Sequence, residues 1–136
     1  VEDESVAPRF ALERTLRGSA RMQSARTHPC GCLIVAGASN CSPENEPVQA
    51  LLAEERQRPR AGFRACVKRA IASGELRDCA ATQVLPDIFT PFLHGRTCEA
   101  RDGVTSENLD AAITSLLTLW DASAVMSGTG QHPKNP

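Results

Sequence analysis

Cysteine and histidine side chains gather in one stretch of the sequence, His28-Pro29-Cys30-Gly31-Cys32, with Cys41 nearby. Thiolates and imidazoles are the ligands that zinc and copper(I) prefer, and an accessible thiolate can also sense oxidants. The Cys-x-Cys spacing lacks the paired Cys-x-x-Cys of common structural zinc sites. The pattern therefore favours cysteines that only pack at the start of a helix, and leaves open a thiol-based redox sensor or metal-binding helical module that uses Cys30, Cys32 and Cys41.

The remaining cysteines, Cys66, Cys79 and Cys98, are scattered along the sequence. Cys66 falls on an apolar helix face, where a thiol packs as a small hydrophobic side chain. The chain also has enough apolar residues to fold without covalent cross-links. We therefore expect reduced thiols rather than a disulfide framework.

A stripe of positive charge is formed by Arg56, Arg60, Arg64 and Lys68, which recur every four residues and share one helix face. Such a stripe could bind phosphate groups. No aromatic side chains interleave with it to stack on bases, which favours a solvated face partly neutralised by Glu54, Glu55 or the acidic N-terminus.

Catalytic patterns are missing from the sequence. His28, His94 and His132 are its three histidines, and no Gly-rich phosphate loop or paired helical metal motif accompanies them. The sequence therefore predicts no enzyme, no catalytic or metal-binding residues and no cofactor.

The composition is that of one soluble domain. The chain has 136 residues, 41% of them hydrophobic and 23% charged, and a formal net charge of -1. The aliphatic and alanine-rich apolar content favours an all-α fold. The charge gives no general attraction to nucleic acid, no apolar run is long enough to cross a membrane, and we expect a cytoplasmic protein.

Three helical patterns precede the C-terminal part of the chain. The first runs from Pro8 to about Arg26, and an uncharged segment over 30–40 should be buried. The longest runs from the turn at 42–47 to Gly74, with a kink or break near Gln57 caused by Pro59; Pro91 should bend the next helix. The residues expected inside from the first helix are Phe10, Leu12, Leu16, Ala20 and Met22.

The C-terminal part predicts a helical hairpin. Apolar residues recur at three- and four-residue spacing over 84–93 and again over 109–120. Gly103 suits the left-handed position after the first helix, and Thr105 can cap the second. Such a hairpin, with little else to cover it, is a natural dimerisation element. The domain organisation predicted from these elements is a flexible lead-in over 1–6, one domain over 7–123 and a disordered tail over 124–136.

Three motifs in this order resemble the tetracycline-repressor-like (TetR) family of transcriptional regulators. Pro29-Cys30-Gly31-Cys32-Leu33-Ile34-Val35 resembles the start of the family's short sixth helix, and Ala72-Ser73-Gly74-Glu75-Leu76-Arg77 the end of its seventh. His94-Gly95-Arg96, followed by Glu99-Ala100-Arg101-Asp102-Gly103, resembles the end of its eighth. The resemblance covers about residues 7 to 122.

This resemblance implies a regulatory domain of about five helices that dimerises through a four-helix bundle. The family's N-terminal helix-turn-helix domain is expected to be missing, so DNA would be contacted only through it, and a naturally headless partner is a further possibility. A small hydrophobic or aromatic effector would bind between the first, third and fourth helices, counting the short buried segment as the second. The expected pocket residues are Met22, Phe63, Cys66, Phe89, Phe92 and His94, and the expected homodimer contacts are Gly95, Leu109, Ile113, Leu116, Leu117 and Trp120.

Overall fold

The computed structural model describes residues 1, 3–24, 32–37 and 42–125, and every regular element in this part of the chain is helical. The body consists of α1 (Pro8–Ser24), α3 (Glu46–Ala72), α5 (Leu85–Arg101) and α6 (Ser106–Ser123). Three short elements connect them, namely α2 (Leu33–Ala36), the 3-10 turn η1 (Pro43–Asn45) and α4 (Ala80–Gln83). The predicted all-α fold is confirmed.

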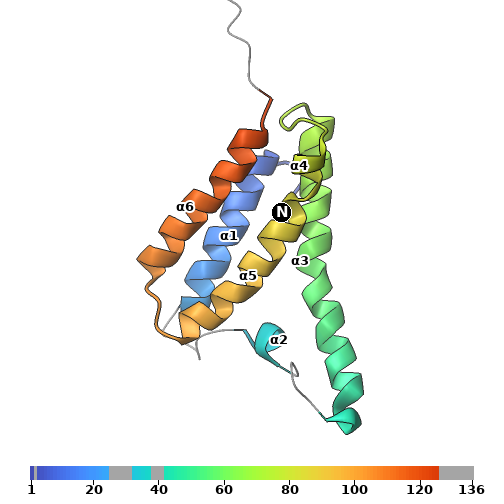
Figure 1. Cartoon of the computed structure of the whole chain (residues 1–136), viewed down its shortest axis with the longest axis vertical. Coiled ribbons are helices and arrows are strands. Elements are labelled where there is room, and N and C mark those ends of the chain that lie inside the picture. Colours follow the sequence, from blue (N-terminus) through green and yellow to red (C-terminus); the bar gives the residue numbers. More distant parts are fainter. Residues whose placement is uncertain (2, 25–31, 38–41, 126–136) are drawn as a thin grey trace, which may run out of the picture.

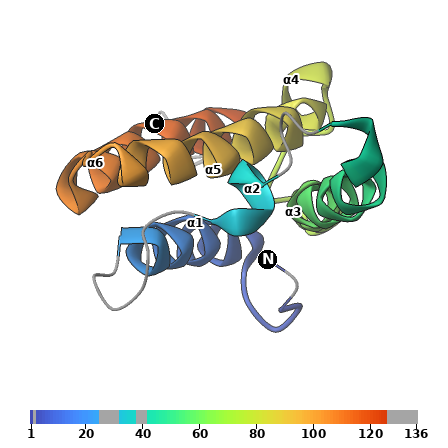
Figure 2. The same ribbon diagram turned by 90° about the horizontal axis from the view of Figure 1, so that it is seen from below.

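The long helices form two layers. Seen along the bundle, α5 and α6 lie side by side in one layer, with α1 and α3 in the other (Figure 2). Helix α1 packs against both α5 and α6, and α3 packs against α1 and α5. The core between the layers is aliphatic and aromatic, with Phe63, Phe89 and Trp120 among its largest buried side chains.

The hairpin turn follows the sequence prediction. Gly103 has a φ of 89°, and Val104 N donates to the carbonyl of Glu99 at 3.0 Å. Thr105 caps α6 by accepting a hydrogen bond from Asn108 N at 3.3 Å. A left-handed residue and a hydroxyl cap together let α5 end and α6 begin within a few residues.

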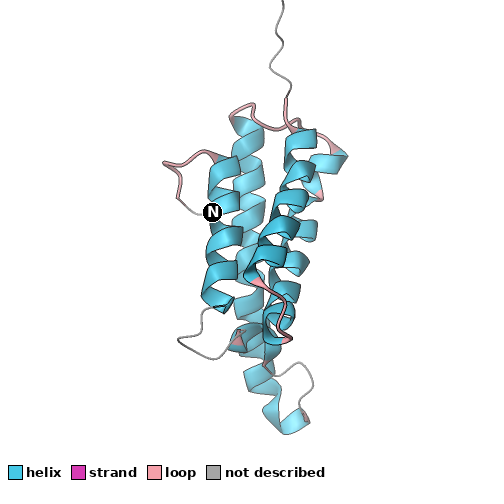
Figure 3. Cartoon of the chain, turned by 90° about the vertical axis from the view of Figure 1, so that its left-hand side faces the viewer, coloured by secondary structure: helices cyan, strands magenta, loops and turns pink. Residues whose placement is uncertain are grey.

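The break expected in the longest helix is absent, because α3 is continuous from Glu46 to Ala72 with Pro59 inside it. Helix α5 likewise continues through Pro91. One proline removes one backbone hydrogen bond, and the buried contacts of Phe63, Cys66 and Val67 further along hold α3 in place. The first half of α3 projects beyond the four-helix body, beside α2 (Figures 1 and 3).

Two expectations about inward-facing residues are wrong. On α1, Leu12, Leu16 and Ala20 are buried, but Phe10 and Met22 are 58% and 62% exposed. The inward stripe of α1 is narrower than the apolar pattern suggested. In the short segment, Leu33 is 81% exposed and none of α2 is buried, because α2 packs mainly against α3 and α5 at the edge of the bundle. Residues 25–31 and 38–41 lie outside the described part.

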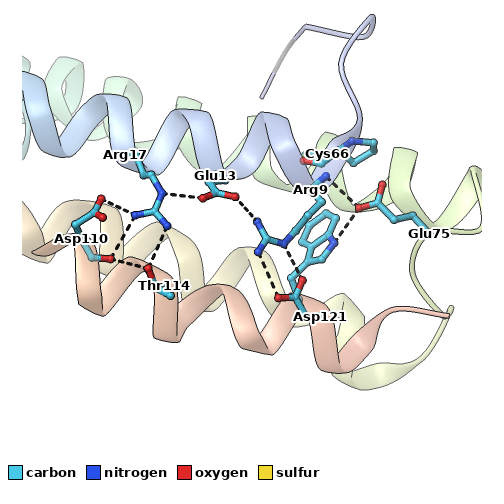
Figure 4. A network of polar contacts seen from close by, with 10 residues as sticks. Arg9, Glu13, Arg17, Cys66, Glu75, Asp110, Thr114 and Asp121 are labelled. Atoms are coloured by element: carbon cyan, nitrogen blue, oxygen red, sulfur yellow. Dashed lines mark hydrogen bonds and ion pairs between the residues drawn. The ribbon is translucent and has the colours of Figure 1, made fainter. Parts of the chain in front are cut away.

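Polar contacts tie α1 to α6 along one edge of the bundle. Glu13 accepts from Arg9 and Arg17 on its own helix, and these arginines pair with Asp121 and Asp110 of α6 (Figure 4). The hydrogen bonds from Arg17 and then Arg9 lower the pKa of the Glu13 carboxyl. These charges are partly exposed, so they orient the helices more than they stabilise them.

The loop after α3 packs against the C-terminal end of α6, which lies opposite the hairpin turn. Gly74 takes a φ of 78°, which turns the chain so that Leu76 forms an isolated antiparallel bridge with Ala124. Arg77 donates to the carbonyls of Ala122 and Ser123, which belong to the last turn of α6. Among the described helices, none combines the length and apolar content needed to cross a membrane.

Candidate functional site

A hollow of about 290 Å³ lies between α1, α3 and α5, the region where the sequence predicted a pocket. Its walls are mostly apolar, and its polar lining residues are Thr15 and Ser19 of α1 and Arg58 of α3. Such a lining suits a small apolar ligand with one or two polar atoms, at the small end of known ligand pockets. It is lined by Val1, Thr15, Ser19, Arg58, Pro59, Gly62, Phe63 and Leu93.

Phe63 is the one residue of the predicted pocket set that lines this hollow. Phe89 and Cys66 are buried in the core behind it: the rings of Phe63 and Phe89 meet edge to face at 6.0 Å, and Cys66 Sγ donates to the carbonyl of Pro8 at 3.4 Å. Burial raises the pKa of the Cys66 thiol, which keeps it protonated. Met22 points to solvent, so it cannot line a pocket here.

The two hydroxyl groups of the hollow were missed by sequence reasoning. Thr15 Oγ1 donates to the carbonyl of Ala11, and Ser19 Oγ accepts from Gln23 Nε2 at 3.2 Å. Both residues stand beside the buried stripe of Leu12 and Leu16 on α1. In the sequence, these two positions could have been recognised as small polar residues at the edge of an apolar helical stripe.

Val1, in the segment before α1, also lines this hollow. Val1 packs against the core, and its backbone nitrogen donates to Thr15 Oγ1 at 2.9 Å. Asp3 pairs with Arg14 at 3.1 Å. Both residues therefore have a partner on α1, and the flexible lead-in over 1–6 stays a prediction.

A second hollow, of about 370 Å³, lies between α5 and α6 near the hairpin turn. It contains Phe92, a predicted pocket residue, together with Arg96, whose guanidinium carbon lies 5.9 Å from the centre of the Phe92 ring. None of its lining residues is shared with the first hollow. Of the predicted pocket residues, Phe63 and Phe92 therefore line two separate hollows, and Cys66 and Phe89 lie in the core. Met22 and His94 line neither hollow.

His94 is half-buried on α5. Burial lowers the pKa of its imidazole, and the positive charges of Arg56 and Arg60 lower it further. The side chain is therefore neutral at pH 7, which fits a packing role better than an ionic one.

Most of the predicted dimer contacts belong to the core of the chain itself. Leu109, Ile113, Leu117 and Trp120 are buried in the bundle, so their surface cannot be offered to a second copy without opening the fold. Leu116 is partly buried. Gly95 is exposed, and a Cβ placed on it would meet no heavy atom within 4 Å.

The basic stripe is partly neutralised by Asp87, a residue that the sequence did not suggest. Asp87 of α5 lies 3.1 Å from Arg60 and 3.7 Å from Arg64, whereas Glu55 pairs with Arg58. Arg56 donates to the carbonyls of Ile34 and Gly37, which attaches α2 to α3. The stripe therefore also has a structural role.

The cysteine cluster is only partly within the described residues. Cys32 is half-buried with a free thiol at the start of α2, whereas His28, Cys30 and Cys41 lie outside the part that the structure describes. Within the described ranges, no group of three or more His, Cys, Asp or Glu side chains could hold a metal ion.

Comparisons with known proteins place the chain in a family. Residues 11–116 match the family described as tetracyclin repressor-like, C-terminal domain. The solved TetR family transcriptional regulator CifR, as a cysteine mutant complexed with 26bp double-strand operator DNA, is 30% identical to this chain with a TM-score of 0.78. Another cysteine mutant of CifR, also complexed with operator DNA, is 29% identical with the same TM-score.

Each alignment covers 84% of this chain but only 60% and 59% of the CifR chains, so the chain spans about three fifths of their length. A comparison with curated proteins finds no match. The family match reaches all four long helices and includes the lining of both hollows except Val1. On this evidence of sequence and fold, the chain belongs to the tetracyclin repressor-like C-terminal domain family of transcriptional regulators.

Proposed function

We propose that the chain is the effector-binding and dimerisation domain of a TetR-like regulator, and that effector binding controls the DNA affinity of a helix-turn-helix domain. The observation that carries the proposal is the hollow between α1, α3 and α5, which is lined both by the core residue Phe63 and by Val1 at the start of the chain. The effector is a small apolar or aromatic molecule, because the lining is mostly apolar.

In this proposal, Val1 links effector binding to the position of the DNA-reading domain. A ligand in the hollow contacts the segment that leads into α1, and a DNA-reading domain placed before that segment would move with it. Binding then shifts the population between two arrangements only by as much as the ligand's affinity differs between them. The operator DNA bound by the CifR structures is consistent with this use of the fold.

Dimerisation uses the outward face of the α5–α6 hairpin. We define the hairpin stripe as Val84, Ile88 and Leu119, which are 49%, 38% and 41% exposed. Apart from α4, which packs against one end of α5 and α6, no described element covers the side of these helices that faces away from α1 (Figure 2). Gly95 follows along α5 and leaves room for a second helix to approach closely. Two such hairpins would form a four-helix bundle.

The effector proposal is tested by binding of 1-naphthol, a neutral aromatic probe, to the chain by calorimetry. Ser19→Leu should fill the hollow and weaken binding by about tenfold or more, since it removes the space for the probe. Ala50→Leu, at an exposed position of α3, is the matched control and should bind as the parent chain does. Equal binding by both variants would place the probe elsewhere and refute the assignment of this hollow.

The alternative, a thiol sensor or metal-binding module, stays a prediction. The CifR structures are of cysteine mutants, and Cys32 is a free, partly accessible thiol in this chain. Thiol titration and metal analysis of protein purified under reducing conditions, with Cys32→Ser beside the parent chain, separate this alternative from effector binding.

A further inference from the structure

The polar residues that line the hollow between α1, α3 and α5 differ in what they can still bind. Thr15 Oγ1 donates to the carbonyl four residues earlier at 2.9 Å and accepts from Val1 N at 2.9 Å, so its proton is used inside the chain. The side chain of Arg58 is 73% exposed and pairs with Glu55 at 3.1 Å. Its charge is therefore already balanced and in contact with water.

Ser19, the third polar lining residue, keeps its proton. Its Oγ accepts from Gln23 Nε2 at 3.2 Å, and no described residue accepts a hydrogen bond from it. Serine inside a helix often donates to the carbonyl four residues earlier, as Thr15 does, but Ser19 makes no such bond. A hydroxyl has one proton and two lone pairs. The bond from Gln23 therefore leaves the proton of Ser19 available to a ligand.

Gln23 holds this hydroxyl in place. It is 5% exposed, its side chain donates to Ser19, and its Oε1 is buried without a hydrogen-bond partner. Burying an amide with part of its hydrogen-bonding capacity unmet costs stability. The amide fixes the position of the Ser19 oxygen, and by donating to it also polarises the O–H group. Gln23 thus has the geometry of a positioning residue for Ser19.

We propose that this hollow recognises a neutral carbonyl compound, an apolar molecule whose C=O oxygen accepts a hydrogen bond from Ser19 Oγ. The apolar body of the ligand rests against Phe63 and Leu93. A neutral ligand with one acceptor fits the mostly apolar lining and its one uncommitted hydroxyl proton. The inference rests on the proposed effector site and specifies the chemical class of the effector.

Two other arrangements would give different preferences. If the Gln23 amide were turned round, Ser19 would donate to its oxygen and present only lone pairs, so a carbonyl oxygen in the ligand would gain nothing. A carboxylate ligand would instead use the charge of Arg58. The experiment below separates both from a neutral carbonyl compound.

The test measures binding of three probes of nearly the same shape to the full chain by calorimetry. They are acetophenone, α-methylstyrene, in which a CH₂ group replaces the carbonyl oxygen, and benzoate, in which a charged oxygen replaces the methyl group. Ser19→Ala should weaken acetophenone binding about fivefold or more and leave α-methylstyrene binding within about twofold of the parent chain. Comparing each probe between the two chains cancels the difference in hydration between the probes. Benzoate should bind the parent chain at least about tenfold more weakly than acetophenone, because burying a carboxylate without a free counter-charge is costly.

Two further variants test the source of the effect. Ser115→Ala, the same substitution at an exposed position of α6, is the matched control and should bind all three probes as the parent chain does. Gln23→Met should weaken acetophenone selectively, because Ser19 would then turn its proton to the carbonyl of Thr15. In the Ser19→Ala background it should have no further effect on the acetophenone preference. The Ser19→Ala comparison holds as a test even if Gln23→Met does not fold.

Binding that Ser19→Leu removes shows that a probe occupies the hollow. With that binding present, equal weakening of both neutral probes in Ser19→Ala, weakening of neither, or tighter binding of benzoate than of acetophenone would overturn the carbonyl class and leave the effector site standing. A parent chain that binds neither of the neutral probes nor 1-naphthol would overturn both proposals.

Discussion

The two faces of the α5–α6 hairpin use apolar residues in opposite ways. The inward face places Leu109, Ile113, Leu117 and Trp120 in the core. The outward face carries the sparser hairpin stripe of Val84, Ile88 and Leu119, with Gly95 further along α5. The difference shows that the richest apolar stripe of each helix packs into the chain's own core, and that only a weaker apolar stripe stays exposed, where we propose that a second copy binds.

The physical reason lies in the two-layer arrangement. Helix α1 crosses behind both α5 and α6 and covers their inward sides, so the hairpin is not bare on both faces as the sequence suggested. Packing into the chain's own core is intramolecular. Forming an interface also costs the translational and rotational entropy of a second molecule. The following changes test the contrast, beginning with the largest effect.

Trp120→Ala tests the inward face. Trp120 is buried, packs near the Phe89 ring at 6.4 Å between centroids, and donates from Nε1 to Glu75. Its loss should lower the free energy of unfolding by about 3–5 kcal/mol, since it leaves a large cavity. Urea denaturation measures this. A loss below about 1 kcal/mol would mean that Trp120 is not part of the core.

Glu75→Ala tests the polar anchor of the same face. Glu75 Oε1 accepts from Trp120 Nε1 at 3.0 Å and from Arg9 N at 3.1 Å. Removing this acceptor leaves two partly buried donors unpaired and should cost about 2 kcal/mol in urea denaturation. Glu54→Ala, at an exposed position of α3, is the matched control and should change stability by less than about 0.5 kcal/mol.

Gly95→Ala tests the outward face, because it should affect folding and association in opposite directions. Glycine inside a helix costs about 0.5–1 kcal/mol relative to alanine, and the added Cβ meets open space within the chain. The substitution should therefore raise the stability of a single chain while weakening association of two. Unfolding and sedimentation, each over a range of protein concentration, distinguish these effects. Weaker folding of the dilute chain would contradict the open position of Gly95.

Glu13→Gln tests the polar edge where α1 meets α6. Because the Arg17 and Arg9 hydrogen bonds lower the pKa of the folded carboxyl, its contribution to stability is full above the ordinary value of 4.5 and is lost as the pH falls through the lower folded value. The parent chain should exceed Glu13→Gln by less than about 1 kcal/mol at pH 7, because the pairs are partly exposed. Denaturation at several pH values should show this difference shrinking below the ordinary value of 4.5; a constant difference would contradict the linkage.

The sequence predicted much of the fold and less of the site. Helical periodicity, Gly103 and Thr105 predicted the hairpin correctly, because local geometry decides those features. Periodicity could not tell that Met22 faces solvent or that Trp120 faces inward, because the direction of a stripe depends on which helices pack beside it. The role of Val1 depends on contacts between distant segments, which spacing does not encode.

The central claim is that the hairpin stripe, rather than the inward face, joins two copies of the chain. The most direct test is the solution mass by light scattering of the parent chain and of an Ile88→Glu, Leu119→Glu double variant. Leu51→Glu, which changes an exposed apolar residue of α3, is the matched control.

We expect the parent chain and the Leu51→Glu control to have the mass of a dimer, and the double variant to have the mass of a folded monomer with unchanged helical circular dichroism. A double variant that stays dimeric, or a parent chain that is monomeric at every concentration tested, would contradict the account.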